Sequence, residues 1–240
     1  MAKVEQLNNT SHRNIKIRTS RDVSDLKDQS ILPLVLAEFP QAAIEFPICF
    51  IKNNQNDDIQ TVALMGIESK ENLFVVDDNK WDGAYMPARY THRPFGLVQN
   101  PNDQTNFGIA INVESNLVNE EEGVALFDAE GNESEFLTKQ KEAMSAYLQQ
   151  EQMTKAFTKE LIDKDFLVQK QINVKVQDQQ YDIDGVYIID EKKIDALSDE
   201  DFLDLRKRGL LNPIFTHLIS MRQMNNLIKR KSEKMGPPAA

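Results

Sequence analysis

Residues 62–98 have the sequence VALMGIESKENLFVVDDNKWDGAYMPARYTHRPFGLV. Two short apolar runs, residues 62–66 and 73–76, are separated here by the polar residues 68–72. Apolar runs of this length, joined by polar residues, are typical of a β-hairpin with a longer loop. A further turn is predicted at residues 77–80, because Asp and Asn side chains can hydrogen-bond to their own backbone. The stretch therefore predicts antiparallel strands, and we expect the fold to be built from such hairpins.

The segment that follows, residues 81–95, combines aromatic rings with prolines. Trp81, the only tryptophan, has a large apolar surface and one N–H donor. It is therefore expected at an edge of the core, where this donor finds a partner. Pro87 and Pro94 each fix their own φ angle and keep the preceding residue out of the α region. We expect a rigid, irregular segment, called the arm below, that holds aromatic rings against the sheet.

Six side chains of the arm are candidates for a recognition surface: Trp81, Asp82, Tyr85, Arg89, His92 and Arg93. Aromatic residues and arginine are enriched among the residues that contribute most to binding energy. In the alternative interpretation the rings belong to the core and the basic side chains are solvated, as is common for both residue types. His92, between two arginines, could also bind an anion, although an isolated surface histidine is the more common situation.

Further strands are predicted wherever short apolar runs are bounded by polar turns. These strands are expected at residues 15–17, 48–51, 95–98, 107–111, 166–176 and 183–189. The polar residues between consecutive runs, such as 99–103, predict that neighbouring strands form hairpins.

Helices are predicted at residues 40–46, 138–164, 198–208 and from 212 onward. The longest of them carries Met, Leu and aromatic residues at helical spacing. Ser198 begins a sequence that resembles a capping box, and Gly209 favours a helix end. The predicted fold class is α+β, with an antiparallel sheet of hairpins packed against the C-terminal helices.

Several short motifs, taken together, resemble one protein family. They include VALMG at 62–66, NLFV at 72–75, Trp81-Asp82, FPQAA at 39–43 and YIIDEKKI at 187–194. In this order they resemble the SapC family of bacterial proteins over roughly residues 15 to 230 (a family distinct from the membrane permease of the same name). Where that family usually carries two arginines, this chain has Thr91 and His92, so Arg89 and His92 would share a basic role.

The resemblance implies a SapC-like single domain over residues 15–231. The polar residues 1–14 are expected to be loose, and residues 232–240 are expected to be a disordered tail. The family takes its name from a surface-layer gene cluster, and members also occur beside genes for outer-membrane receptors. This context implies a link to surface-layer or outer-membrane export or uptake systems.

Composition restricts the classes of partner. The 240 residues carry a formal net charge of -10, with 28% charged residues. Binding to nucleic acid or to an anionic membrane surface needs concentrated Lys and Arg, so neither is expected. No apolar run is long enough for a membrane span, and the N-terminus lacks the apolar core of a secretory signal. We therefore predict no membrane insertion and a cytoplasmic location.

Local motifs for chemistry are absent from the sequence. No HExxH, CxxC, GxSxG, GxGxxG or phosphate-loop pattern occurs. Glu120, Glu121 and Glu122 are interpreted as a solvated loop rather than a metal site, because adjacent residues do not face one point. Cys49 lies in an apolar run and is expected to be a buried small hydrophobe. We predict neither a metal nor a cofactor.

Two functional hypotheses remain. The first is a non-enzymatic binding or accessory protein that presents the arm to a protein or peptide partner. The second is an enzyme, or the partner of an enzyme, that acts on a protein or small molecule through residues of the arm, because Asp82, Tyr85, His92 and Arg93 are of mixed acid–base type.

Overall fold

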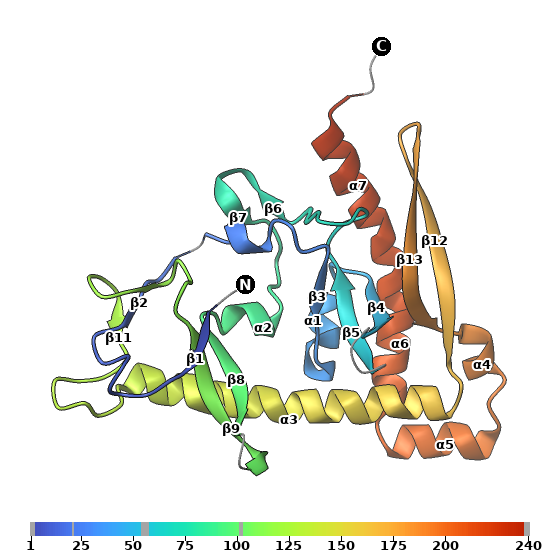
Figure 1. Cartoon of the computed structure of the whole chain (residues 1–240). Helices are drawn as coiled ribbons and strands as arrows, with labels where there is room; N and C mark the ends of the chain where they lie inside the picture. Colours follow the sequence, from blue (N-terminus) through green and yellow to red (C-terminus); the bar gives the residue numbers. More distant parts are fainter. Residues whose placement is uncertain (1–2, 21, 54–57, 101–102, 238–240) are drawn as a thin grey trace. The chain divides into compact units, whose positions relative to one another are not determined.

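The structure, a computed structural model, describes residues 3–20, 22–53, 58–100 and 103–237 (Figure 1). The chain divides into two compact units. Unit 1 comprises Met1–Arg21 with Ala88–Gln149, and unit 2 comprises Asp22–Pro87 with Gln150–Ala240. Both units contain helices and antiparallel strands, so the fold is α+β as predicted. The single domain over residues 15–231 stays a prediction.

Unit 1 contains two small antiparallel sheets. Its strands are β1 (Val4–Gln6), β2 (Lys16–Ile17), β8 (Phe95–Asn100), β9 (Asp103–Asn112), β10 (Val118–Asn119) and β11 (Val124–Ala125). The strand order is β1-β9-β8 in one sheet and β10-β2-β11 in the other. The helix α2 (Ala88–Thr91) and the first part of α3 (Glu135–Asp163) complete the unit. The predicted hairpin at residues 95–111 is thus confirmed, as is the strand near residue 16.

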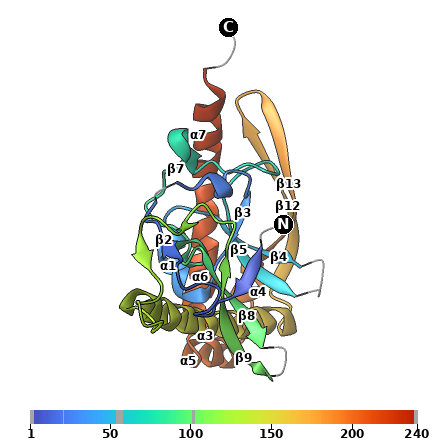
Figure 2. The ribbon, with the colours of Figure 1, turned by 60° about the vertical axis from the view of Figure 1, so that its left-hand side comes forward.

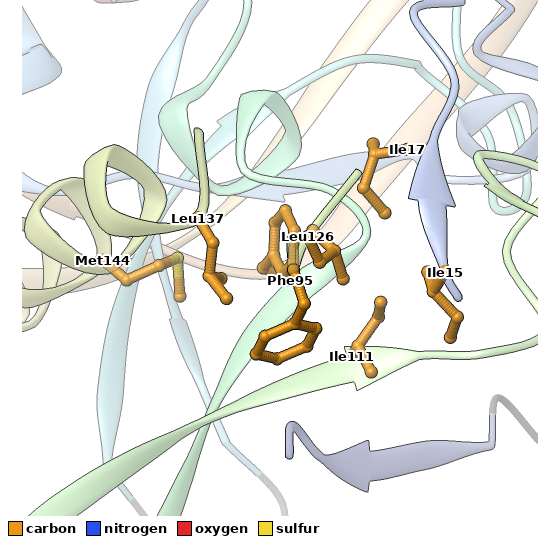
Figure 3. Packing of buried hydrophobic residues seen from close by; sticks show 8 residues of the cluster. Ile15, Ile17, Phe95, Ile111, Leu126, Leu137 and Met144 are labelled. Atoms are coloured by element: carbon orange, nitrogen blue, oxygen red, sulfur yellow. The ribbon is translucent and has the colours of Figure 1, made fainter. Parts of the chain in front are cut away.

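The core of unit 1 gathers side chains from β2, β8, β9 and α3 and from the residues next to β2 and β11 (Figure 3). Its members are Ile15, Ile17, Phe95, Ile111, Leu126, Phe127, Leu137 and Met144. The fully buried Leu126 is also held by its backbone, because its N–H donates to the carbonyl of Ile15 at 3.2 Å. Burial of such side chains is the main favourable term for a small unit.

The first fourteen residues, predicted to be loose, have regular structure in part. β1 pairs with β9, and Val4 lies opposite Asn112. The ring of His12 is buried, and its Nδ1 accepts a hydrogen bond from the N–H of Asn8 at 3.2 Å. Polar composition alone could not indicate this pairing, because the partner strand is about a hundred residues away in the sequence.

Unit 2 is built on a five-stranded antiparallel sheet of order β12-β13-β4-β5-β3. Its strands are β3 (Ile31–Pro33), β4 (Ile48–Lys52), β5 (Ile59–Leu64), β12 (Leu167–Val176) and β13 (Gln179–Ile189). A separate two-stranded ribbon joins β6 (Val75–Val76) to β7 (Lys80–Trp81). The predicted hairpin of β12 and β13 is confirmed, and its turn is shorter than expected.

Unit 2 also contains α-helices and short 3₁₀ helices, and the C-terminal ones contact the five-stranded sheet. They are η1 (Ser24–Leu26), η2 (Leu36–Glu38), α1 (Phe39–Ala42), η3 (Asp77–Asn79), the second part of α3, α4 (Glu191–Asp195), α5 (Asp199–Lys207), α6 (Leu211–Ser220), η4 (Met221–Gln223) and α7 (Met224–Met235). Both ribbon views show α7 running beside the β12–β13 hairpin (Figures 1 and 2). Ser198 caps α5 by accepting from the N–H of Asp201, and Gly209 has a φ of 73° after its end, as predicted.

Three predictions for unit 2 differ in part from the structure. Residues 62–66 and 73–76 do not form a hairpin together: β5 pairs with β3 and β4, and β6 pairs with β7. A backbone hydrogen bond does join the two runs, from the N–H of Leu73 to the carbonyl of Met65. The single helix expected after residue 212 is divided by η4 into α6 and α7. In addition, α7 extends to Met235, into the stretch expected to be a disordered tail.

His217 connects α6 to the middle of the five-stranded sheet. Its ring is completely buried, 5.1 Å from the ring of Phe50, and its Nε2 accepts the N–H of Ile189 at 3.0 Å. Ser220, one turn later, accepts the N–H of Ile48 at 3.0 Å. Burial lowers the pKa of His217 to about 4, and an interaction with the backbone of Ile48 opposes this only in part. The imidazole is therefore neutral and structural.

Leu126→Ala is expected to lower the free energy of unfolding of unit 1 by about 3 kcal/mol, because it leaves a cavity in a closed cluster. Urea denaturation and hydrogen exchange of the β8 and β9 amides measure this. The control is Val124→Ala, two residues earlier and 43% exposed, which should cost less than about 1 kcal/mol. Equal losses in the two variants would contradict the role given to the cluster.

His217 should make stability depend on pH between about 6.5 and 4. In the unfolded chain its pKa returns to the ordinary value near 6.5, so the unfolded state takes up a proton first as the pH falls. The stability that the neutral ring provides is complete above pH 6.5 and is lost by about 3 kcal/mol as the pH falls to 4.

Denaturant unfolding across this pH range is the measurement, for the wild type and for His217→Gln. The substitution should flatten the slope, whatever its effect on absolute stability. Ser220→Ala removes a neighbouring contact without removing a titrating group, so it should retain the slope. A wild-type slope that survives in His217→Gln would assign the effect to other residues.

Candidate functional site

A surface pocket of about 690 Å³ lies in unit 2 beside the first half of the arm. Its walls come from three separate parts of the chain: the end of α1, the arm, and the segment from η4 into α7. The residues that matter for its chemistry are Gln41, Ile44, Glu45, Tyr85, Asn225 and Arg230. A volume of this size is in the range of pockets that bind small molecules or single side chains of a partner.

Glu45 joins all three walls of the pocket. Its carboxylate accepts the backbone N–H groups of Ala84 and Tyr85, each at 3.0 Å, and lies 3.9 Å from the guanidinium of Arg230. Its carbonyl accepts the side-chain amide of Asn226 at 3.0 Å. With only 13% of its side chain exposed, Glu45 is a fixed structural acceptor in the wall of the pocket.

Arg230, from α7, is held by the arm in several ways at once. Nη1 donates to the carboxylate of Asp82 and Nη2 donates to the carbonyl of the same residue, both at 2.7 Å. The guanidinium also lies 4.1 Å from the centre of the Phe74 ring, in cation–π geometry. Charge-assisted bonds of this kind are stronger than neutral ones, so the helix and the arm are firmly joined.

Trp81 takes the edge position predicted for it. Its ring stacks on Phe74, with centroids 5.7 Å apart and an interplanar angle of 27°, and its Nε1 donates to the carbonyl of Tyr85 at 3.0 Å. Gly83 lies against the indole, where a Cβ atom would come within 2.6 Å of Nε1. The tryptophan thus supports the arm from behind, and it does not line the pocket.

Tyr85 is the candidate residue that does line the pocket. Its hydroxyl donates to the buried carboxylate of Glu38 at 2.7 Å, and its N–H donates to Glu45. Because both polar ends are bound, the ring is fixed in place. Tyr85 therefore offers a rigid aromatic surface.

Apart from the exposed Lys229, the free polar groups of the pocket are neutral. The side-chain amides of Gln41, Gln223 and Asn225 make no hydrogen bond to any other described residue. Each amide has both a donor and an acceptor. Ile44 contributes the apolar part, since 75% of its surface is exposed. This combination can bind a group that has an apolar body and neutral hydrogen-bonding atoms.

The remaining candidates, Arg89, His92 and Arg93, belong to unit 1. Arg89 is exposed on α2, and Arg93 donates through Nε to the carbonyl of Tyr90 at 3.1 Å. The ring of His92 packs edge-on against Tyr147 at 5.6 Å, and burial lowers its pKa. The six candidates are thus divided between the two units: three support or line the pocket of unit 2, and three lie in unit 1.

Sequence reasoning missed Ile44, Glu45 and Arg230. Glu45 was expected only to belong to the short helix predicted at residues 40–46, and Arg230 only to the helix predicted from residue 212 onward. The available signal was weak, because Ile44 is one of several apolar residues in the helix predicted at residues 40–46. Nothing local in the sequence indicated that α1 and α7 would meet the arm.

The site can now be compared with known proteins. The family whose sequence model matches this chain is SapC, with residues 7–227 matched. The chain belongs to the SapC family. No curated protein and no solved structure matches it. The matched range begins before β2 and ends within α7, so it includes all the lining residues of the pocket of this SapC-family chain except Lys229 and Arg230.

Within residues 3–20, 22–53, 58–100 and 103–237, no three His, Cys, Asp or Glu side chains are grouped closely enough to hold a metal ion. Over the same part of the chain, no helix combines the length and the apolar character that crossing a membrane requires. Burial raises the pKa of Cys49 to about 12, so this thiol is neutral.

Arg230→Met should lower the free energy of unfolding by about 2 kcal/mol, because it leaves the two oxygens of Asp82 without their donors and removes the cation from Phe74. Arg230→Lys should lose somewhat less, since a lysine keeps the charge but not the two-pronged geometry. Urea denaturation measures both variants. The matched control is the neighbouring Lys229→Met, whose ion pair with Glu233 is 3.8 Å long and exposed. A loss in Arg230→Met no larger than in this control would refute the anchoring role.

Proposed function

We propose that this SapC-family chain is a non-enzymatic binding or accessory protein that recognises a protein or peptide partner through the pocket of unit 2. The observation that carries the proposal is the exposed Ile44 beside three unoccupied side-chain amides. An isoleucine with three quarters of its surface in water gains free energy when a partner covers it.

A peptide segment fits the chemistry of this pocket. Its backbone presents donors and acceptors alternately, and the amides of Gln41, Gln223 and Asn225 can bind either kind. An apolar side chain of the segment would lie against Ile44 and the ring of Tyr85. Charged ligands are less suitable, because Glu45 and Arg230 already bind to the protein itself, and Lys229 is a solvated cation with 74% of its side chain exposed.

The rigidity of the walls supports a role in recognition. Glu45 and Arg230 fix the arm against α7, so a partner would not need to order the site when it binds. Sites that are already ordered bind more tightly, because less conformational entropy is lost. The acid–base residues of the arm have structural partners: Asp82 binds Arg230, and Tyr85 binds Glu38. This arrangement favours binding over catalysis.

The cellular setting is proposed from family membership and composition. The family name links such chains to surface-layer genes, so the partner would belong to a surface-layer or outer-membrane export or uptake system. The net charge of -10 makes nucleic acid an unsuitable partner. We place this interaction in the cytoplasm.

The test is recovery of a partner with the tagged protein, gently purified from its own kind of cell and analysed by native mass spectrometry. The wild type should retain a stoichiometric protein or peptide. Ile44→Asp should reduce recovery at least about tenfold, because a carboxylate in the contact must be desolvated without a partner.

The matched control is Ile162→Asp, at an exposed isoleucine of α3 that is not part of the pocket. Both variants should unfold at the wild-type urea concentration, and the control should retain the partner. Unchanged recovery with a folded Ile44→Asp would rule out this pocket. Arg93→Ala in the same assay shows whether the basic residues of unit 1 contribute separately.

A further inference from the structure

The helix α6 has apolar side chains on two faces, and the described chain covers only one of them. Ile214 and His217 point into the core of unit 2 and are completely buried. On another face, Phe215 is 41% exposed and Ile219 is 63% exposed. Between Leu211 and Ser220 the sequence contains no Asp, Glu, Lys or Arg. A helix that is apolar on both faces is typically buried on both.

The uncovered face forms one wall of a second surface pocket, about 760 Å³ in volume. Phe215, Leu218 and Ile219 line it at positions i, i+3 and i+4 of α6, which is one stripe of the helix, and Arg222 of η4 lies just beyond them. Val168 of β12 and Ile188 of β13 lie opposite each other in the sheet and form the other wall. We call this surface the α6 groove. It shares no lining residue with the pocket beside the arm.

The charges around the α6 groove have a definite pattern. Three cations line it, Lys170, Lys192 and Arg222, and none of them lies within ion-pair distance of a carboxylate in the described part of the chain. Two acids also line it, but both are at the N-terminus of α4. There Asp190 caps the helix and Glu191 lies in its first turn, where negative charge is stabilised.

This pattern contrasts with the chain as a whole, whose net charge is -10. Cations beside exposed apolar side chains, on an otherwise acidic protein, attract a partner with carboxylates at the matching positions. A second copy of this chain, bound symmetrically through the same surface, would place the three cations of each groove against those of the other. An anionic cofactor would not use Phe215 and Ile219.

We propose that the α6 groove binds an amphipathic helix of a partner protein, with aliphatic residues on one face and Asp or Glu beside them. The aliphatic stripe would pack along Phe215 and Ile219 and against Val168 and Ile188. Its carboxylates would meet Lys170, Lys192 and Arg222. Helices commonly bind in grooves of this kind, with anchors at i, i+3, i+4 and i+7. This interaction is separate from the one proposed for the pocket beside the arm.

The test uses two labelled helical peptides with the same Leu stripe, one flanked by Glu and the other by Lys. Fluorescence anisotropy with the full chain should give about tenfold tighter binding of the Glu peptide at low salt, and the difference should shrink as salt is added. Ile219→Asp should weaken binding of the Glu peptide at least about tenfold. In the double variant Lys192→Glu with Arg222→Glu, the preference should reverse in favour of the Lys peptide.

Ile162→Asp is the matched control, because it changes an exposed isoleucine of α3 that lines neither pocket and should leave peptide affinity unchanged. All changed side chains are exposed, so circular dichroism and urea unfolding should match the wild type. Failure to bind the Glu peptide, equal binding of the two peptides, or loss of affinity in Ile162→Asp would overturn the proposal. A wild-type dimer in sedimentation that Ile219→Asp dissociates would assign the groove to a second copy and would overturn it as well.

Discussion

The guanidinium of Arg230 is the contact on which the geometry of the pocket depends. It binds two oxygens of Asp82 and covers the ring of Phe74, on which Trp81 stacks. The next residue, Lys231, is buried and pairs with Glu71 at 2.8 Å. Burial disfavours the charge on Glu71, but hydrogen bonds from Lys231 and Lys234 outweigh it and lower the pKa of this carboxyl. Adjacent residues of α7 therefore hold two different loops, and the helix orders the arm.

The sequence allowed the hairpins with short local turns to be predicted. The strand pairs β8–β9 and β12–β13 join neighbouring runs, so alternation and turn residues were sufficient. The pairing of residues 62–66 could not be predicted in the same way. Val62 lies opposite Cys49 on one side and Pro33 on the other. Apolar periodicity identifies a strand, but it does not identify the neighbours of that strand in the sheet.

Part of the candidate site was also predictable. An aromatic ring beside a tight turn suggested the arm, and Trp81, Asp82 and Tyr85 do support or line the pocket. The other walls required tertiary structure, because Ile44 and Arg230 are separated by most of unit 2 in the sequence. Their side chains also have ordinary interpretations as a helix residue and a dipole-compensating cation, so no local rule distinguishes them. The division of the arm between two units was likewise not visible in a continuous segment.

The break between α6 and α7 explains why two surfaces of different chemistry lie so near each other in the chain. Buried side chains at His217, Met224 and Leu227 recur through η4 at intervals compatible with one helix, and no Pro or Gly marks the turn. The core-facing side is therefore continuous, which is why one helix was predicted. On the outer side the chemistry changes within two residues: Arg222 lines the cationic α6 groove, and Gln223 lines the pocket beside the arm, where the free polar groups are mostly neutral amides. Because the two surfaces share no residue, a segment bound to one need not displace a segment bound to the other. A single short 3₁₀ turn thus separates two proposed binding surfaces, one suited to an acidic helix and the other to a neutral peptide segment.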